Sequence, residues 1–371
     1  MLQYYGILGM PHSWGFVAQF LLVALQKRGV SLKCISTNAL KSIHTDLIPS
    51  VLTDAAEKKA LETDVSLSYT IPTNLPKIKA AHRIHIYNYE TTVLPKGFAD
   101  LMNTHAHLIL PSSTFSYNIF RDNGVDEEKM AVVPHGIDPS MFHPSFPPLR
   151  FKNIAPEKFK FLMVGSPHWR KGHDILLRAY LEEFRNDKDV VLIIKTSMNS
   201  LEKKNRIHVD FKVLFDKLHR RYDYPWPEIK LIGEKLDYLG GLYTYADALV
   251  LPSRTEGFSL TPLEAVASKL PVITTRYGGH LDYLNDDNCY LIDCDIVPAP
   301  NYMQYIASHS DARMAEPRVP HLRQLMRKVK TDYEDAQAKA GLAYTQCVPS
   351  LTWDNAADRI LSLIRERGWA I

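Results

Sequence analysis

Residues 248–267 read ALVLPSRTEGFSLTPLEAVA, and this stretch is the most informative one in the chain. Its apolar run, 248–251, is typical of a buried strand and ends at Pro252, which cannot donate a hydrogen bond to a sheet. A polar loop follows, and a helix is predicted to begin near Thr261, with Pro262 at its first position. A strand, a loop and a helix in this order indicate a parallel α/β sheet, whose ligands bind where its strands end.

Two carboxylates, Glu256 and Glu264, lie in this stretch at the two ends of the predicted turn into the helix. Unpaired N–H groups at a helix start attract anions such as a diphosphate, and Gly257 permits close approach of the backbone. Glu264 has a structural alternative, because Thr261 to Glu264 matches a capping box. Glu256 alone could be a solvated loop residue. The two carboxylates together favour a binding site.

The same alternation of strands and helices extends in both directions along the chain. In the first half we predict a helix over 14–25, an irregular segment over 58–79, and strands at 2–8, 32–36, 84–87, 108–110 and 131–133. In the second half strands are predicted at 159–164, 190–195, 229–232, 248–251, 271–274 and 290–292. A proline-dense stretch from Pro134 to Pro148 separates the halves. The sequence therefore predicts two doubly wound α/β domains, 1–147 and 149–352, followed by an amphipathic helix within 353–371.

Bulk properties narrow the class of protein. A chain of 371 residues is long enough for two domains with their own cores, and its net charge of +3 does not favour a nucleic-acid partner. The four cysteines form no CxxC pair, which indicates reduced thiols rather than a zinc site. No apolar segment is long enough to span a membrane, and no signal-peptide pattern is present. We therefore expect a cytoplasmic protein.

Two further features leave alternatives open. Basic amphipathic stretches at 203–221 and 323–330 could contact the inner face of a membrane peripherally, although acidic residues interrupt the first. Asp293 and Asp295 form an Asp-x-Asp pattern of the kind that binds Mg²⁺ or Mn²⁺ with a diphosphate. Because three-residue patterns often arise by chance, no metal site is expected there.

The run from Glu256 to Glu264 resembles the Glu-x7-Glu signature of the retaining glycosyltransferases of family 4, the group 1 glycosyl transferases. Surrounding segments resemble the same family in order and spacing: 132–138 (VVPHGID), 161–165 (FLMVG), 170–174 (RKGHD), 264–273 (EAVASKLPVI) and Gly278-Gly279. The resemblance implies the GT-B fold, with two doubly wound Rossmann-like domains facing a central cleft. The first domain would bind the acceptor, the second would bind the nucleotide sugar, and the last helix would cross back to the first.

This resemblance also implies roles for individual residues. Glu264 would bind the ribose hydroxyls, a role that suits a carboxylate. Glu256 would lie against the donor sugar, and Lys171 with Arg170 would neutralise the leaving diphosphate. The remaining donor-binding residues would act through the backbone. Phosphate oxygens would be bound by the backbone of Gly257, Phe258, Ser259 and Leu260. Gly15 would approach the donor phosphate from the first domain. For Arg170 and Lys171 the structural alternative is a pair of solvated surface charges.

The sequence departs from the family at two places. Ser166 stands where family members usually carry an arginine, and Arg170 is a candidate for the missing cation. In the first domain, Asn88 or Glu90 stands near the position where many relatives have a histidine. The donor's base and sugar and the acceptor therefore stay open.

The expected activity is a retaining, metal-independent, hexosyltransferase-type glycosyltransferase without a cofactor. It would move a sugar from a nucleoside diphosphate sugar to a glycan, a lipid or a small molecule. A nucleotide-sugar epimerase of related fold and a non-catalytic sugar-nucleotide-binding protein are the alternatives. Whether Glu256 forms a covalent adduct or supports front-face departure of the leaving group is left open.

Overall fold

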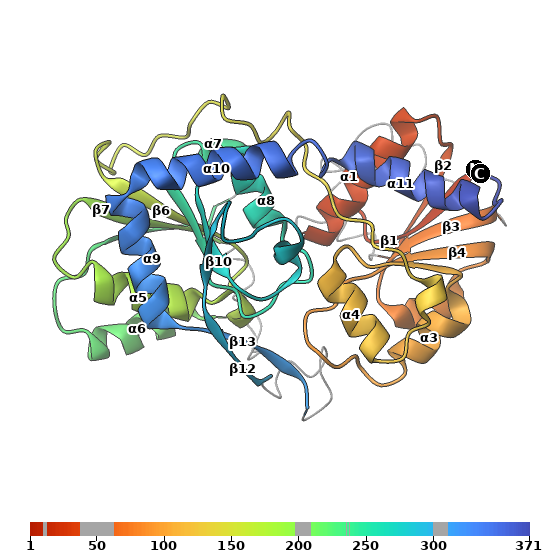
Figure 1. Cartoon of the computed structure of the whole chain (residues 1–371), viewed down its shortest axis with the longest axis horizontal. Helices are drawn as coiled ribbons and strands as arrows, with labels where there is room; N and C mark the ends of the chain where they lie inside the picture. Colours follow the sequence, from red (N-terminus) through yellow and green to blue (C-terminus); the bar gives the residue numbers. More distant parts are fainter. Residues whose placement is uncertain (10–12, 38–62, 197–208, 235, 237, 300–310) are drawn as a thin grey trace. The chain divides into compact units, whose positions relative to one another are not determined.

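The computed structural model describes residues 1–9, 13–37, 63–196, 209–234, 236, 238–299 and 311–371. The chain divides into two compact units (Figure 1). The first comprises Met1–Asp138 and Ser350–Ile371, and the second comprises Pro139–Pro349. Among the described residues, no helix is both long and apolar enough to cross a membrane.

Five parallel strands form the sheet of the first unit, in the order β2-β1-β3-β4-β5. Their bounds are Leu2–Gly6 (β1), Leu32–Ser36 (β2), Thr63–Tyr69 (β3), Ala80–Ile86 (β4) and Leu108–Leu110 (β5). Tyr4 lies opposite Cys34 on one side and Leu67 on the other, and all three are buried. Because side chains alternate along a strand, this row is part of one buried face of the sheet.

The first unit also contains α1 (Ser13–Lys27), η3 (Pro72–Lys77), α3 (Phe98–His105), α4 (Thr114–Asp122), η4 (Glu127–Lys129) and α11 (Trp353–Glu366). Helices α1 and α11 lie side by side, although they come from opposite ends of the chain (Figure 1). The rings of Phe20 and Trp353 stack with centroids 5.9 Å apart, and Arg28 pairs with Asp354 and Asp358. The C-terminal helix is therefore an integral part of the first unit.

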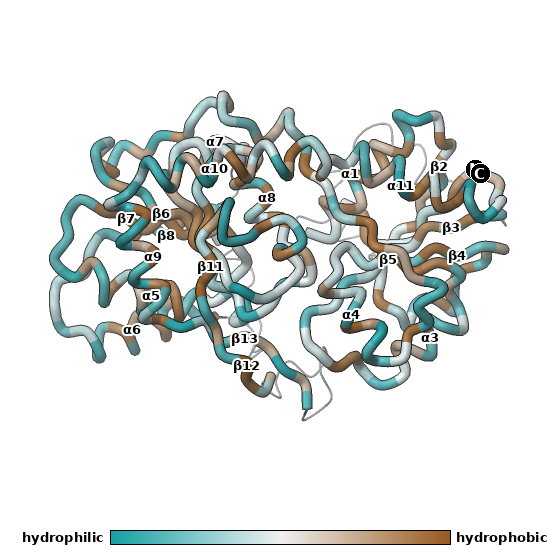
Figure 2. Tube along the Cα trace, viewed as in Figure 1, coloured by the Kyte–Doolittle hydropathy of each residue, from teal (hydrophilic) through white to brown (hydrophobic). Residues whose placement is uncertain are grey.

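Six parallel strands form the sheet of the second unit, in the order β11-β10-β9-β6-β7-β8. Their bounds are Phe159–Val164 (β6), Val190–Lys195 (β7), Glu228–Ile232 (β8), Ala248–Leu251 (β9), Val272–Thr275 (β10) and Tyr290–Ile292 (β11). Hydrophobic residues dominate this sheet (Figure 2), and β6, β7 and β9 are almost wholly buried, as strands covered on both faces are. Counted along the chain the order is 3-2-1-4-5-6, so its direction reverses between β6 and β9.

Around this sheet lie η5 (Trp169–Lys171), α5 (His173–Glu183), α6 (Phe211–Arg221), α7 (Gly240–Tyr243), α8 (Leu260–Ala267), η7 (Gly279–Asp282), α9 (Val319–Thr331) and α10 (Tyr333–Cys347). An antiparallel pair, β12 (Cys294–Pro298) and β13 (Arg313–Pro317), follows β11. Helices α5 and α9 pack together, and Arg327 joins them through Glu183 and Asp187. Of the first basic stretch, residues 203–208 lie outside the described part of the chain. In the second stretch, Arg323 and Arg327 form ion pairs with acidic residues on and just after α5.

All six strands predicted for the second half are present, with bounds within one residue of the prediction. Two predictions for the first half are wrong. Residues 131–133 form no strand: Ala131 and Val133 donate to the carbonyls of Ile109 and Pro111, but Pro134 follows at once and cannot continue the ladder. Residues 58–79 are not irregular, since they contain β3 and η3. The alternation that marks β3 spans only 65–69, and polar neighbours hide it; the prediction for 58–62 lies outside the described residues.

The boundary between the units lies after Asp138, earlier than the predicted position at Pro147. The intervening segment packs on α7: Leu149 N–H donates to the carbonyl of Gly241 at 2.8 Å. A Cβ at Gly240 would lie 2.1 Å from the carbonyl oxygen of Met141, so this close approach requires a glycine. At the other boundary, Ile137 N–H donates to the carbonyl of Leu351, which attaches residues 350–352 to the first unit rather than to the second.

Candidate active site at the carboxyl ends of β6 and β9

Two loops meet at the point where the strand order of the second unit reverses. One follows β6 and contains η5, and the other follows β9 and leads into α8. The backbone N–H of Arg254 donates to the carbonyl of Arg170 at 2.6 Å, which joins the loops directly. In open α/β sheets this reversal is where ligands bind, because the loops on its two sides leave a crevice between them.

Glu256 lies between two cations at this place. Its side chain is 3% exposed. Lys171 Nζ lies 2.7 Å from one carboxylate oxygen, and Arg170 Nη1 lies 2.9 Å from the other. Ser253 Oγ donates to the oxygen that Lys171 contacts, also at 2.7 Å. The carboxylate is thus buried with both of its oxygens paired, as a buried charge requires.

The charge state of Glu256 follows from these contacts. Burial by itself raises the pKa of a carboxyl group. Here the positive charges of Lys171 and Arg170, with the hydrogen bonds from Lys171 and Ser253, outweigh burial and hold the pKa of Glu256 well below its usual range. Glu256 is therefore ionised at neutral pH.

The loop with the two cations is shaped by glycine and histidine. His168 caps η5 by accepting from Arg170 N–H, and Gly172 ends η5 with a φ of 75°. A Cβ at Gly172 would lie 2.0 Å from the carbonyl oxygen of Pro252, so both the backbone conformation and the contact with the β9 loop require glycine. The stem of Lys171 lies across Gly165, at the end of β6. Ser166 is exposed, while Arg170 is the residue whose guanidinium reaches Glu256.

Helix α8 begins at Leu260, one residue earlier than predicted, so Pro262 is its third residue rather than its first. Its N-cap is Ser259, whose φ of 73° is unusual for a residue with a side chain. Tyr283 Oη donates to the carbonyl of Ser259 at 2.6 Å, and the Tyr283 ring packs against Phe258. Among the described residues, the buried hydroxyl of Ser259 has no hydrogen-bond partner.

The capping-box alternative for Glu264 is wrong, because Thr261 lies inside the helix and the N-cap residue is Ser259, whose side chain makes no capping hydrogen bond. Glu264 instead accepts a short hydrogen bond from Tyr243 Oη, which comes from α7 and is buried. Burial raises the pKa of Glu264 to about 7, against the opposing effects of the Tyr243 hydrogen bond and the charge of Lys171. The two glutamates thus differ in charge state: Glu256 is fixed as an anion, and Glu264 titrates near neutrality.

One family model matches the part of the chain that carries this arrangement. Residues 158–301, which include both glutamates and both cations, match the family model described as glycosyl transferases group 1. The matched residues all lie within the second unit. This confirms the resemblance that the Glu-x7-Glu stretch indicated.

The curated relatives of this chain are distant. A D-inositol 3-phosphate glycosyltransferase from Paenarthrobacter aurescens is 27% identical over 189 residues, which is 50% of this chain and 44% of the relative. An MMP alpha-(1->4)-mannosyltransferase from Mycolicibacterium hassiacum is 26% identical over 195 residues, 52% of this chain and 43% of the relative. The chain thus spans less than half the length of these relatives.

Solved structures resemble the whole chain in fold. HepE from Anabaena, in complex with UDP-glucose, superposes with a TM-score of 0.70 at 14% identity and covers 98% of this chain and 99% of that one. Sucrose-phosphate synthase from Thermosynechococcus elongatus gives 0.70 at 15% identity, with 99% and 98% covered. Two parallel-sheet α/β units with these neighbours confirm the GT-B fold class, and the central cleft between the domains stays a prediction.

The remaining predicted residues lie in the first unit. Gly15 is buried in the first turn of α1, and its role toward the donor stays a prediction. Asn88 has internal partners: its carbonyl oxygen accepts from the backbone and the hydroxyl of Ser112, and its amide lies 3.1 Å from His135 Nε2. A ligand contact by Asn88 or Glu90 stays a prediction.

Asp293 follows β11, Asp295 lies on β12, and each pairs with an arginine. Asp293 lies 3.3 Å from Arg276, and its backbone N–H donates to His321 Nδ1 at 3.0 Å; Asp295 pairs with Arg318 at 2.5 Å. Among the described residues, no group of three or more acidic, histidine or cysteine side chains is arranged to hold a metal ion. The Asp-x-Asp pattern is thus explained by ion pairing.

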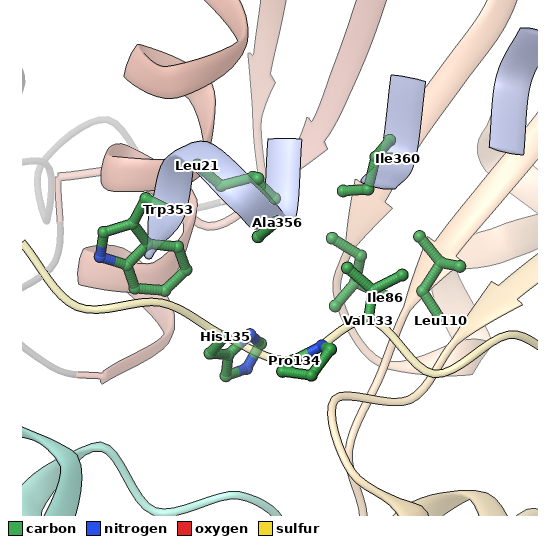
Figure 3. Close-up of a pocket in the computed structure, with 9 residues that line it drawn as sticks. All are labelled: Leu21, Ile86, Leu110, Val133, Pro134, His135, Trp353, Ala356 and Ile360. Carbon is green, nitrogen blue, oxygen red and sulfur yellow. The ribbon is translucent and has the colours of Figure 1, made fainter. Parts of the chain in front are cut away.

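A small cavity lies in the first unit, between α11 and the sheet (Figure 3). It is lined by Leu21, Ile86, Leu110, Val133, Pro134, His135, Trp353, Ala356 and Ile360. Its volume of about 10 Å³ corresponds to one water molecule. Burial lowers the pKa of its polar member, His135, to about 3, so this histidine is neutral. The cavity is a packing gap and not a site for a sugar nucleotide.

Sequence reasoning assigned no role in the site to four residues that build it, although Gly278 was among the residues that carry the resemblance. Ser253 and Arg254 stand inside the quoted stretch, where their closeness to Glu256 was the available signal. Gly278 has a φ of 125°, and its Cα lies so near the backbone of Glu256 that a Cβ would approach to 3.0 Å. Tyr243, 21 positions before Glu264, gave no local signal.

Proposed function

We propose that this protein is a retaining glycosyltransferase that moves a sugar from a nucleoside diphosphate sugar to an acceptor. The observation that supports it best is the position of Glu256 between Lys171 and Arg170, at the strand-order reversal and three residues before the N-cap of α8. The cations come from the loop after β6, and the buried carboxylate and the helix N-terminus come from the loop after β9. A purely structural ion pair would not need the helix terminus beside it.

The chemistry of sugar transfer suggests a role for the two cations and for the start of α8. When the bond from the sugar to the diphosphate breaks, negative charge concentrates on the leaving phosphate oxygens. Lys171 and Arg170 would stabilise this charge, and the free N–H groups at the start of α8 with the hydroxyl of Ser259 would bind the phosphate. Because the charge grows along the reaction, such fixed donors lower the barrier more than they tighten substrate binding.

Recognition of the nucleoside would come from Glu264. A carboxylate accepts two hydrogen bonds from a vicinal diol, and the ribose of any sugar nucleotide presents one. Tyr243 fixes the orientation of Glu264 from the other side. Two relatives are named a D-inositol 3-phosphate glycosyltransferase and a lipopolysaccharide core biosynthesis mannosyltransferase, so polyol phosphates and glycans are the first acceptors to test.

Location is a separate part of the proposal: a cytoplasmic enzyme with a peripheral membrane contact. Lys212, Lys217, Arg220 and Arg221 are exposed on α6, whereas the arginines of α9 are paired with acids. Helix α6 is therefore the better candidate for contact with anionic lipids. Co-sedimentation with vesicles that contain an anionic lipid tests it, and equal binding after the four cations are replaced by serine would refute it.

The test of the proposed activity is a panel of uridine, guanosine and adenosine diphosphate sugars, in EDTA and with candidate acceptors. We expect one donor to release its nucleoside diphosphate when acceptor is added, and proton couplings in NMR spectra of the product to report the donor's anomeric configuration. An altered sugar nucleotide without release would favour the epimerase. Binding without any turnover would favour the non-catalytic alternative.

A further inference from the structure

Arg254 lies directly behind the candidate site and is 2% exposed. A guanidinium has five N–H donors, and all five are used here. Nε and Nη2 donate to Glu316 at 2.7 and 3.0 Å, and Nη1 and Nη2 donate to Asp174 at 2.9 and 2.8 Å. The fifth bond runs from Nη1 to the carbonyl of Trp169 at 2.9 Å. Arg254 therefore has no donor left for a substrate.

Three segments besides its own loop are held by this one side chain. Asp174 belongs to the first turn of α5, Glu316 to β13, and Trp169 to η5. The guanidinium also lies 3.6 Å above the ring of Trp169, a close cation–π contact. Ala315 N–H donates to the carbonyl of Arg254, which joins β13 to the β9 loop a second time.

We propose that Arg254 is a positioning residue for sugar transfer, and this inference rests on the proposed function. It fixes η5, and with it Lys171 and Arg170, against the loop that carries Glu256 two positions further along. The two loops follow different strands, so their spacing is not set by local sequence. A displacement of about 1 Å in a catalytic group can cost about a hundredfold in rate, which makes such a brace necessary.

The decisive variant is Arg254→Lys, which keeps the charge but cannot form the planar, bidentate bonds to both carboxylates. We expect kcat to fall about a hundredfold, with the KM for the sugar nucleotide changed less than about tenfold. Glu316→Gln, which removes one anchor on β13, is the milder second variant and should lower kcat in the same direction. The matched control is Arg327→Lys: Arg327 also pairs with two acids and lies over an aromatic ring, but it joins α9 to α5 away from the site loops. Its kcat should stay at the wild-type value.

A triple variant separates positioning from plain stability. If Arg254 acts through the cation loop, then Arg254→Lys added to a variant that lacks both cations, Arg170→Ala with Lys171→Ala, should change kcat less than about threefold, because both groups that it positions are already absent. A second drop of the full hundredfold would overturn the proposal.

Amide hydrogen exchange gives a readout that needs no donor. Exchange in residues 165–172 should rise about tenfold in Arg254→Lys and stay unchanged in Arg327→Lys. Unchanged exchange in Arg254→Lys would overturn the positioning role. If the wild-type protein releases no nucleoside diphosphate from any sugar nucleotide while this exchange result holds, the proposed function is wrong. The conclusion that Arg254 fixes the position of the loop is then still supported.

Discussion

Lys171 Nζ lies 2.7 Å from Glu256 Oε1, so the cation assigned to the leaving group is already neutralised by a carboxylate of the same protein. Arg170 pairs with the other oxygen of the same carboxylate. A diphosphate that enters must therefore compete with Glu256 for both cations. This competition weakens product binding and should favour release of the nucleoside diphosphate.

Glu256→Gln removes the competing charge and nearly keeps the shape. We expect its affinity for whichever of UDP, GDP and ADP binds the wild-type protein to rise about tenfold, while turnover falls at least about a hundredfold. Isothermal titration and initial rates measure the two effects. Glu228→Gln is the control, because Glu228 pairs with Lys158 at the amino ends of the strands, at the opposite edge of the sheet. Weaker binding in Glu256→Gln would mean that Glu256 holds the cations ready for the ligand.

Lys171→Ala removes the cation that supports the leaving group. One fixed donor at developing charge is worth about 10²–10³ in kcat, and we expect a loss of this size with a folded protein. Lys158→Ala, which breaks the ion pair at the far edge of the sheet, should leave kcat unchanged. A kcat within about threefold of wild type in Lys171→Ala would remove Lys171 from the site.

Glu264 should make folding stability depend on pH. Its pKa is about 7 in the folded protein and near 4.5 without the fold. Between these values the folded state keeps a proton that the unfolded state loses, so stability falls as pH rises from about 4.5 to about 7, by at most about 3 kcal/mol. Buried histidines also make stability depend on pH, because burial lowers the pKa of His85, His135 and His173. Glu264→Gln lacks only the Glu264 contribution, so the unfolding free energy of wild type minus that of Glu264→Gln, measured in urea, should fall as pH rises from about 5 to about 7. A difference that does not change with pH would contradict the titration of Glu264.

Sugar-nucleotide binding should follow the same titration in the opposite sense. The ionised carboxylate is the better acceptor for ribose hydroxyls, so affinity should rise as pH passes about 7. Tyr243→Phe removes a hydrogen bond that lowers the pKa of Glu264, so the midpoint of this rise should move to higher pH. An intact sugar nucleotide is the ligand of choice, because a bare diphosphate has a terminal phosphate that titrates near pH 6. A midpoint that does not move would show that Glu264 does not contact the ligand.

Gly172→Ala should destabilise the second unit more than a left-handed backbone alone accounts for. The backbone costs about 1–2 kcal/mol for a residue with a side chain, and the new Cβ would also collide with the carbonyl of Pro252. Gly368→Ala is the matched control, since Gly368 has a φ of 68° and open space around it. Urea unfolding of both variants compares the costs, and equal costs would contradict the contact.

Metal removal should leave transfer unchanged. Lys171, Arg170 and the start of α8 are proposed to do the work that a divalent cation does elsewhere, so rates in EDTA and in Mg²⁺ should agree. Asp293→Asn and Asp295→Asn should also keep activity, because these carboxylates pair with Arg276 and Arg318. Activity that requires Mg²⁺ and is lost in both variants would restore the metal site.

The local sequence pattern was sufficient to predict the strands of the second unit. Its strands are continuous apolar runs between polar turns, and a strand buried on both faces leaves this signature without reference to the rest of the chain. Strand β3 was not predicted, because its alternation of apolar and polar residues covers only five positions, 65–69, between polar neighbours. The glutamates and cations were also found locally, since each stands beside a strand end.

What the sequence by itself determined is therefore which segments are strands, where they end, and which charged residues follow them. The tertiary structure alone decided which strand lies beside which, and hence that the loop after β6 meets the loop after β9. From that neighbourhood come the pairing of Lys171 with Glu256, the five bonds of Arg254, and the Tyr243 partner that replaces the expected capping box of Glu264. The physical reason is the sequence separation of the contacts. Hydrophobic periodicity is a local pattern that shows which face of a segment is buried. A hydrogen bond between residues 21 or 85 positions apart forms only when the strand order of the sheet brings the two residues together.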